Sequence, residues 1–148
     1  MIETTQAITI DRPVEEVFAY VTDTSNDPAW HTDILEARKT SAGPIGIGTT
    51  WRLRFKPVMG VSEGDTEVVA FEPNRKTVQQ GVVGPMQPTL TYLFEPAGGG
   101  TRFTRRVEIR VSGMMRLMEP LMKLMTPRGN ARFLANLKKV LEERSAAR

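Results

Sequence analysis

The chain has 148 residues, a length typical of one domain, and 40% of them are hydrophobic and 25% charged, as in ordinary globular proteins. It has no cysteine, which excludes disulfides, thiolate metal sites and cysteine nucleophiles. The net charge is only +3 and the arginines are spread along the chain, which argues against nucleic acid as a partner.

The first predicted element is a strand from Ile2 to Ile10, because this stretch is rich in β-branched residues. Its first letters, MIETTQ, lack the basic and apolar segments of a signal peptide, so we expect a cytoplasmic protein. A short helix follows, with Asp11 expected as its N-cap and Pro13 in its first turn. The next stretch, TDTSNDPAWH, predicts a turn or a second short helix that ends near Trp30.

Residues 35–111 carry turn signals at short intervals, and strand-like segments lie between them. Consecutive strands on short loops indicate an antiparallel meander. The expected strands are TTWRLRF, DTEVVAFE, KTVQQGVV, TLTYLFE and TRFTRRVEIRV. After Gly113 the pattern is helical to the end of the chain, and we expect Pro120 and Pro127 to kink or interrupt this helix. We expect one α+β domain over residues 1–148.

The order of these elements resembles the START/Bet v 1-like superfamily, whose fold is the helix-grip fold. The segments that carry the resemblance are Ile8–Asp23, Trp30, Phe71–Val78 and Gly98–Thr104. The polyketide cyclase/dehydrase and lipid-transport branch is the most similar. The resemblance implies a curved seven-stranded antiparallel sheet around a long C-terminal helix, two short helices after the first strand, and a cavity between sheet and helix. Because this superfamily includes enzymes and binding proteins, the resemblance implies no single activity.

Strand alternation predicts which side chains line that cavity. With residues 97–100 as a loop, the inward pairs are Phe94–Phe103, Tyr92–Arg105 and Leu90–Val107. With residues 73–76 as a loop, Glu67 and Gln80 also face inward. Trp51 alternates with Leu53 and Phe55 and is expected inside, and Trp30 is expected near the opening.

Arg105 is the unusual inward residue, because a buried guanidinium needs a partner. One interpretation is a polar cluster of Glu67, Gln80, Tyr92 and Arg105 that anchors the polar end of an apolar ligand. Two others remain open: a register slip that turns Arg105 toward water, or a structural ion pair.

The segment SGMMRLMEPLMKLMTPRG holds five of the eight methionines. On a helix its apolar residues, which include Met118, Leu121 and Met122, cover about half of the circumference. Core packing, the wall of an adaptable ligand cavity and a helix lying on a membrane surface are the alternatives, and we favour the cavity wall.

His31 is the only histidine, and the carboxylates lack metal-loop spacing, so we expect no metal and no cofactor. The favoured function is therefore intracellular binding of a hydrophobic small molecule such as a lipid, fatty acid or polyketide-like compound. The alternative is a cyclase or dehydratase with Glu67, Tyr92, Arg105 and His31 as candidate acid–base residues. A third hypothesis is an interaction module that forms a homodimer. We expect no integral membrane association.

Overall fold

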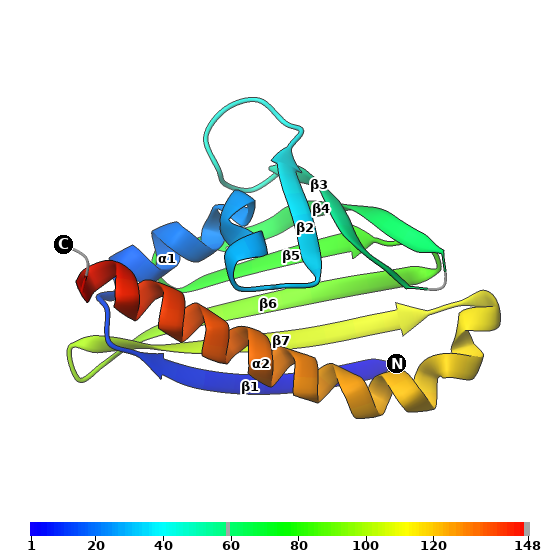
Figure 1. The fold of residues 1–148 in the computed structure, drawn as a ribbon. Helices are drawn as coiled ribbons and strands as arrows, with labels where there is room; N and C mark the ends of the chain where they lie inside the picture. Colours follow the sequence, from blue (N-terminus) through cyan, green and yellow to red (C-terminus); the bar gives the residue numbers. More distant parts are fainter. Residues whose placement is uncertain (59, 147–148) are drawn as a thin grey trace.

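Figure 1 shows a computed structural model of the chain, which describes residues 1–58 and 60–146. The strands are β1 (Ile2–Ile10), β2 (Ile34–Lys39), β3 (Thr50–Val58), β4 (Val61–Glu72), β5 (Lys76–Val82), β6 (Met86–Ala97) and β7 (Gly100–Val111). The helices are α1 (Val14–Thr22) and α2 (Glu119–Ala146), and the 3₁₀-helices are η1 (Thr24–Ala29) and η2 (Gly113–Met118).

The seven strands form one antiparallel sheet in the order β1-β7-β6-β5-β4-β3-β2. The long helix α2 crosses one face of this sheet over β1 and β7, and α1 and η1 lie at one end of the sheet (Figure 1). This arrangement is the helix-grip fold, so the predicted fold class is confirmed. We call the face toward α2 the inner face.

The start of α1 differs from the prediction. Pro13, not Asp11, is the N-cap, and no side chain caps the helix. Proline suits this position because it has no N–H that would need an acceptor. The N–H of Asp11 instead donates to the carboxylate of Glu142 on α2, at 3.0 Å. This contact ties the end of β1 to the last turns of α2.

The hairpin between β6 and β7 has the predicted register. Phe94 is opposite Phe103 and Tyr92 is opposite Arg105, with Gly98 and Gly99 in the turn. Both turn glycines have positive φ, at 55° and 86°, which residues with a Cβ rarely adopt. The tight turn therefore fixes which β7 side chains face α2.

The register predicted for the hairpin between β4 and β5 is wrong by one residue. Glu72 pairs with Lys76, so the loop has three residues, with Asn74 at a φ of 61°. A bulge between Val68 and Ala70 shifts the register again before Glu67 pairs with Gln80. Because side chains alternate between faces, this change of register determines which residues of β4 and β5 are buried.

The prolines near the C-terminus affect the helix less than predicted. Residues 113–118 form η2, and α2 begins only at Glu119. Pro120 is thus in the first turn, where a backbone N–H has no intrahelical partner. The helix continues through Pro127 to residue 146. Among the described residues, no helix is both long and apolar enough to cross a bilayer.

The hydrophobic core consists of two separate clusters. The larger one lies between the inner face and the helices and includes Val17, Trp30, Tyr92, Phe103 and Leu137. The smaller one contains Ile34, Trp51 and Leu53, with Phe55 packed against it at the β2–β3 corner. Trp51 and Phe55 therefore do not belong to the core that surrounds Tyr92 and Phe103.

Candidate functional site

Arg105 lies inside the protein, as alternation along β7 predicts. It is 3% exposed, and its Nη1 donates to Oδ1 of Asn130 on α2 at 2.7 Å. Asn130 in turn donates from Nδ2 to the backbone oxygen of Arg105 at 3.3 Å. These reciprocal hydrogen bonds join β7 to the point where the core-facing part of α2 begins.

Three aromatic rings surround the guanidinium. Its Cζ lies 5.8 Å from the ring centroid of Trp30, 5.9 Å from that of Tyr92 and 5.8 Å from that of Phe133. Phe103 packs edge-on against Tyr92, with ring centroids 5.4 Å apart. Cations are attracted to aromatic faces at such distances. The sequence-predicted residues Trp30, Tyr92, Phe103 and Arg105 are thus brought together by the fold.

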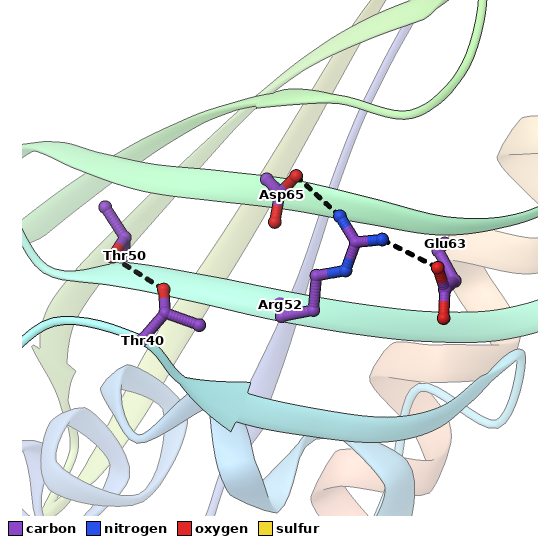
Figure 2. A network of polar contacts seen from close by, with 5 residues as sticks. All are labelled: Thr40, Thr50, Arg52, Glu63 and Asp65. Atoms are coloured by element: carbon purple, nitrogen blue, oxygen red, sulfur yellow. Dashed lines mark hydrogen bonds and ion pairs between the residues drawn. The ribbon is translucent and has the colours of Figure 1, made fainter.

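An outward-facing arginine shows how unusual this environment is. Arg52 on β3 donates to Asp65 at 2.7 Å and to Glu63 at 2.6 Å on the outer face of the sheet, beside a Thr40–Thr50 contact (Figure 2). Arg105 makes no ion pair with a carboxylate of the described residues, and its side chain donates to the amide oxygen of Asn130. A buried cation without an ion-pair partner is costly, so its presence needs a reason other than stability.

Asp27 and His31 bring titratable groups to the same cluster. Burial raises the pKa of the Asp27 carboxyl well above its ordinary value, and the charge of Arg105 opposes this rise. Burial lowers the pKa of His31 well below its ordinary value, and the charge of Arg105 lowers it further. The His31 ring stacks on Phe133 at a centroid distance of 3.9 Å. Burial also raises the pKa of Tyr92.

Several buried polar atoms of this cluster have no hydrogen-bond partner among the described residues. They are Oδ1 of Asp27, Nε1 of Trp30, Nδ1 of His31 and Nε of Arg105. Buried polar groups in native proteins are almost always hydrogen-bonded to protein, water or a ligand, so these four atoms could bond to a ligand or to water. The cluster thus combines apolar rings with both donors and acceptors that a polar group could use. We call Asp27, Trp30, His31, Tyr92, Arg105 and Asn130 the Arg105 cluster.

Glu67 and Gln80 are not part of it, contrary to the sequence-based assignment. Both side chains are exposed on the outer face, while their neighbours Val68 and Gln79 are buried. The three-residue loop changes the face of Gln80, and the bulge between Val68 and Ala70 changes the face of Glu67. Glu67 and Gln80 instead border a hollow of about 890 Å³ on the outer side of the sheet.

The 890 Å³ hollow lies away from the predicted cavity between sheet and helix. A second hollow, of about 350 Å³, lies at α1 beside Tyr20 and Arg144. Close to Arg105 the interior is instead filled by the rings of Tyr92, Phe103 and Phe133.

The methionine-rich segment does not line the interior as predicted. Leu121 is exposed, and Met118 and Met122 are only partly buried. No residue from Glu119 to Gly129 is buried, whereas α2 is anchored from Asn130 onward. The N-terminal third of α2 is thus the part that can move with the smallest loss of packing.

Sequence reasoning missed Asp27 and Asn130. A signal was available for Asn130, which precedes Phe133, Leu134 and Leu137 on the apolar stripe of α2 and is polar there. No periodic pattern marks Asp27, because it lies in the irregular segment before Pro28. Among the described residues, no group of three or more histidine, cysteine or acidic side chains could hold a metal ion.

Comparison with known proteins places the chain among related sequences and folds. A sequence model of the family described as polyketide cyclase / dehydrase and lipid transport matches residues 1–142. An uncharacterised protein of Mycobacterium tuberculosis is 29% identical over 143 residues, which is 90% of this chain and 80% of that protein.

Solved structures share the fold at low sequence identity. A START superfamily protein from Mycobacterium smegmatis has a TM-score of 0.77 at 15% identity, covering 95% of this chain and 97% of that chain. The di-domain ARO/CYC protein StfQ of the steffimycin biosynthetic pathway also has a TM-score of 0.77, at 13% identity, covering 98% of this chain and 52% of that chain. At such identities these structures establish only the common architecture.

Proposed function

This chain belongs to the polyketide cyclase/dehydrase and lipid transport family, and on that premise we propose that it binds an apolar small molecule whose polar end contacts Arg105. The observation that carries the proposal is a buried guanidinium among three aromatic rings, without a carboxylate partner. A ligand carboxylate or carbonyl oxygen would supply the missing acceptor. Fatty acids and polyketide-like acids have this combination of groups.

Access to this site would open beneath the N-terminal third of α2. Residues 119–129 are not buried, so moving them disrupts little of the core. Displacement of Asn130 would then leave Nη1 of Arg105 free to donate to an oxygen of the ligand. Met118 and Met122 border this route, and their flexible side chains can adapt to ligands of different shape. Trp51 and Phe55 would contact only a ligand long enough to reach the second core cluster.

The proposal is tested by titrating the protein with fatty acids of increasing chain length and with their methyl esters, and by native mass spectrometry of protein purified from cells. Acids should bind more tightly than esters. Arg105→Gln should weaken binding of the acids by roughly thirtyfold or more, since loss of one partner of a buried charge pair costs about 2–5 kcal/mol. Arg102→Gln is the matched control, because Arg102 is exposed on the outer face of the same strand.

An unchanged affinity in Arg105→Gln would refute the proposed anchor. Equal losses in Arg105→Gln and Arg102→Gln would indicate only nonspecific attraction of anions to a basic protein. Far-UV circular dichroism of each variant establishes that the fold is retained.

A second function, cyclisation or dehydration of a polyketide-like substrate, is favoured by the opposite pKa shifts of Asp27 and His31 in one cluster. Environments that raise the pKa of one group and lower that of another are typical of acid–base pairs. Asp27 would donate a proton and neutral His31 would accept one, with Tyr92 and Arg105 orienting a carbonyl oxygen.

Mass spectrometry of a poly-β-keto thioester incubated with the protein tests this second function. Asp27→Asn and His31→Gln should abolish product formation while ligand affinity persists. If the unaltered protein binds the substrate without turnover, only the binding function is supported. Unchanged turnover in both variants would exclude the acid–base roles assigned to Asp27 and His31.

A further inference from the structure

One apolar surface of the protein packs against nothing in the described structure. It is formed by Met114 and Leu117 of η2 and by Leu121, Leu124 and Met125 of α2, whose exposed fractions range from 46% to 82%. We call these five residues the Met/Leu surface. Among the described residues, they are half of the large hydrophobic side chains that are exposed. Such a concentration on one short segment marks an interaction site.

The direction of this surface shows that it does not belong to the core. The buried stripe of α2 includes Asn130, Leu134, Leu137 and Leu141. With about 100° of rotation per residue, Leu121, Leu124 and Met125 project roughly 120–160° away from Leu137. On the core-facing line this end of the helix instead carries Glu119 and Lys123. The apolar and polar sides are therefore exchanged between the two halves of α2.

Basic residues surround and continue the Met/Leu surface. Arg116, Arg128 and Arg132 are exposed, and Arg128 and Arg132 follow Leu121, Leu124 and Met125 along the same outward side of α2, with Arg132 also 3.9 Å from Asp33. The acid in this segment, Glu119, is paired with the N-terminal ammonium at 2.6 Å. The segment is thus apolar at its centre and cationic at its rim.

We propose that the Met/Leu surface docks on an anionic lipid bilayer, with η2 and the first turns of α2 lying along the membrane surface. Apolar side chains of such segments enter the boundary between headgroups and acyl chains, while lysine and arginine contact the phosphates. Charge favours this partner over a second copy of the chain. A twofold contact through the same surface would bring the arginines of both copies together, whereas lipid phosphates neutralise them.

The test is co-sedimentation of the ligand-free protein with vesicles of phosphatidylcholine alone or mixed with phosphatidylglycerol. We expect binding to the mixed vesicles that weakens as salt is added. Leu117→Asp and Leu124→Asp should each lower the partition coefficient by roughly tenfold or more, because each removes an apolar side chain from the lipid. Arg128→Glu should weaken binding to the mixed vesicles.

Two matched controls carry the same substitution at exposed apolar residues elsewhere. Ile47 lies in the loop before β3 and Val82 at the end of β5, and both are more than half exposed. Ile47→Asp and Val82→Asp should leave vesicle binding unchanged. Arg105→Gln should also bind vesicles normally, which separates this proposal from the ligand site.

Three results would overturn the inference. The first is that the protein does not sediment with the mixed vesicles. The second is that the Met/Leu variants and the control variants lose vesicle binding equally. The third is that the protein associates with itself without lipid and that Leu117→Asp abolishes this association. The last result, read by light scattering over a range of concentrations, would assign the surface to contacts between copies of the chain.

Discussion

The interaction between Arg105 and Asn130 offers a direct test of whether the buried arginine serves stability or function. Asn130→Leu removes the acceptor at 2.7 Å and leaves a buried guanidinium without it. Removing one partner of a buried hydrogen bond costs about 1–3 kcal/mol, and more when the group left behind is charged. We therefore expect Asn130→Leu to be strongly destabilised.

The double variant Arg105→Met, Asn130→Leu should recover this loss. It replaces both partners of the hydrogen bond with apolar side chains, a change that can be nearly neutral or stabilising. Arg105→Met alone should lie between the two, because Oδ1 of Asn130 then lacks its donor, at a cost of about 1–3 kcal/mol. The coupling between the two sites should exceed about 2 kcal/mol.

Urea unfolding followed by far-UV circular dichroism gives the free energies of unfolding for this cycle. Arg102→Met on the outer face is the control, with an expected change within about 0.5 kcal/mol. The reasoning fails if the double variant is as unstable as Asn130→Leu, because Arg105 would then stabilise the fold itself. A stable double variant that no longer binds fatty acids would show that the arginine is kept for binding at the expense of stability.

Three further predictions concern the pKa of a buried group, a close backbone contact and the outer face. Because the folded pKa of His31 is lowered, acidification below about pH 6.5 protonates the unfolded state first. The contribution of His31 to the free energy of unfolding should then fall by up to about 1.4 kcal/mol per pH unit, while the raised pKa of Asp27 acts in the opposite direction. Urea titrations of the unaltered protein and of His31→Gln at neutral and mildly acidic pH should therefore give different slopes, and equal slopes would refute the lowered pKa of His31. Gly100→Ala should lower the free energy of unfolding by about 1–3 kcal/mol, because its Cβ would lie 2.5 Å from the carbonyl oxygen of Ile10. Gly46→Ala is the control and should leave the free energy of unfolding unchanged, because a Cβ at residue 46 would have no neighbouring atom within 4 Å. Glu67→Gln should leave fatty-acid affinity unchanged, and a loss of binding would contradict its outward position.

The two hairpins explain how much of the sheet could be predicted from the sequence. Residues 97–100 have glycines where a two-residue turn needs them, so the register of Tyr92 and Arg105 followed from local chemistry. The β4–β5 hairpin combines a three-residue loop with a bulge, and neither leaves a clear pattern in the sequence. The loop reversed the face of Gln80 and the bulge reversed the face of Glu67, each by a shift of one residue.

The candidate site could be predicted only in part for a similar reason. Period-two alternation placed Tyr92 and Arg105 inside, but it does not predict which side chains of the helices contact them. Asn130 and Asp27 come from α2 and η1, whose positions depend on tertiary packing. The apolar arc of the methionine segment was recognised, but the arc alone does not show whether it faces the protein interior or the solvent.

The separation of the core into two clusters has a consequence for motion. Ile34, Trp51 and Leu53 are packed together at the sheet edge formed by β2, without being part of the larger cluster. A small core of this kind can come apart while the rest of the protein stays folded. Backbone amides of β2 should therefore exchange with deuterium much sooner than those of β7, and the protein would flex at that corner during its native lifetime.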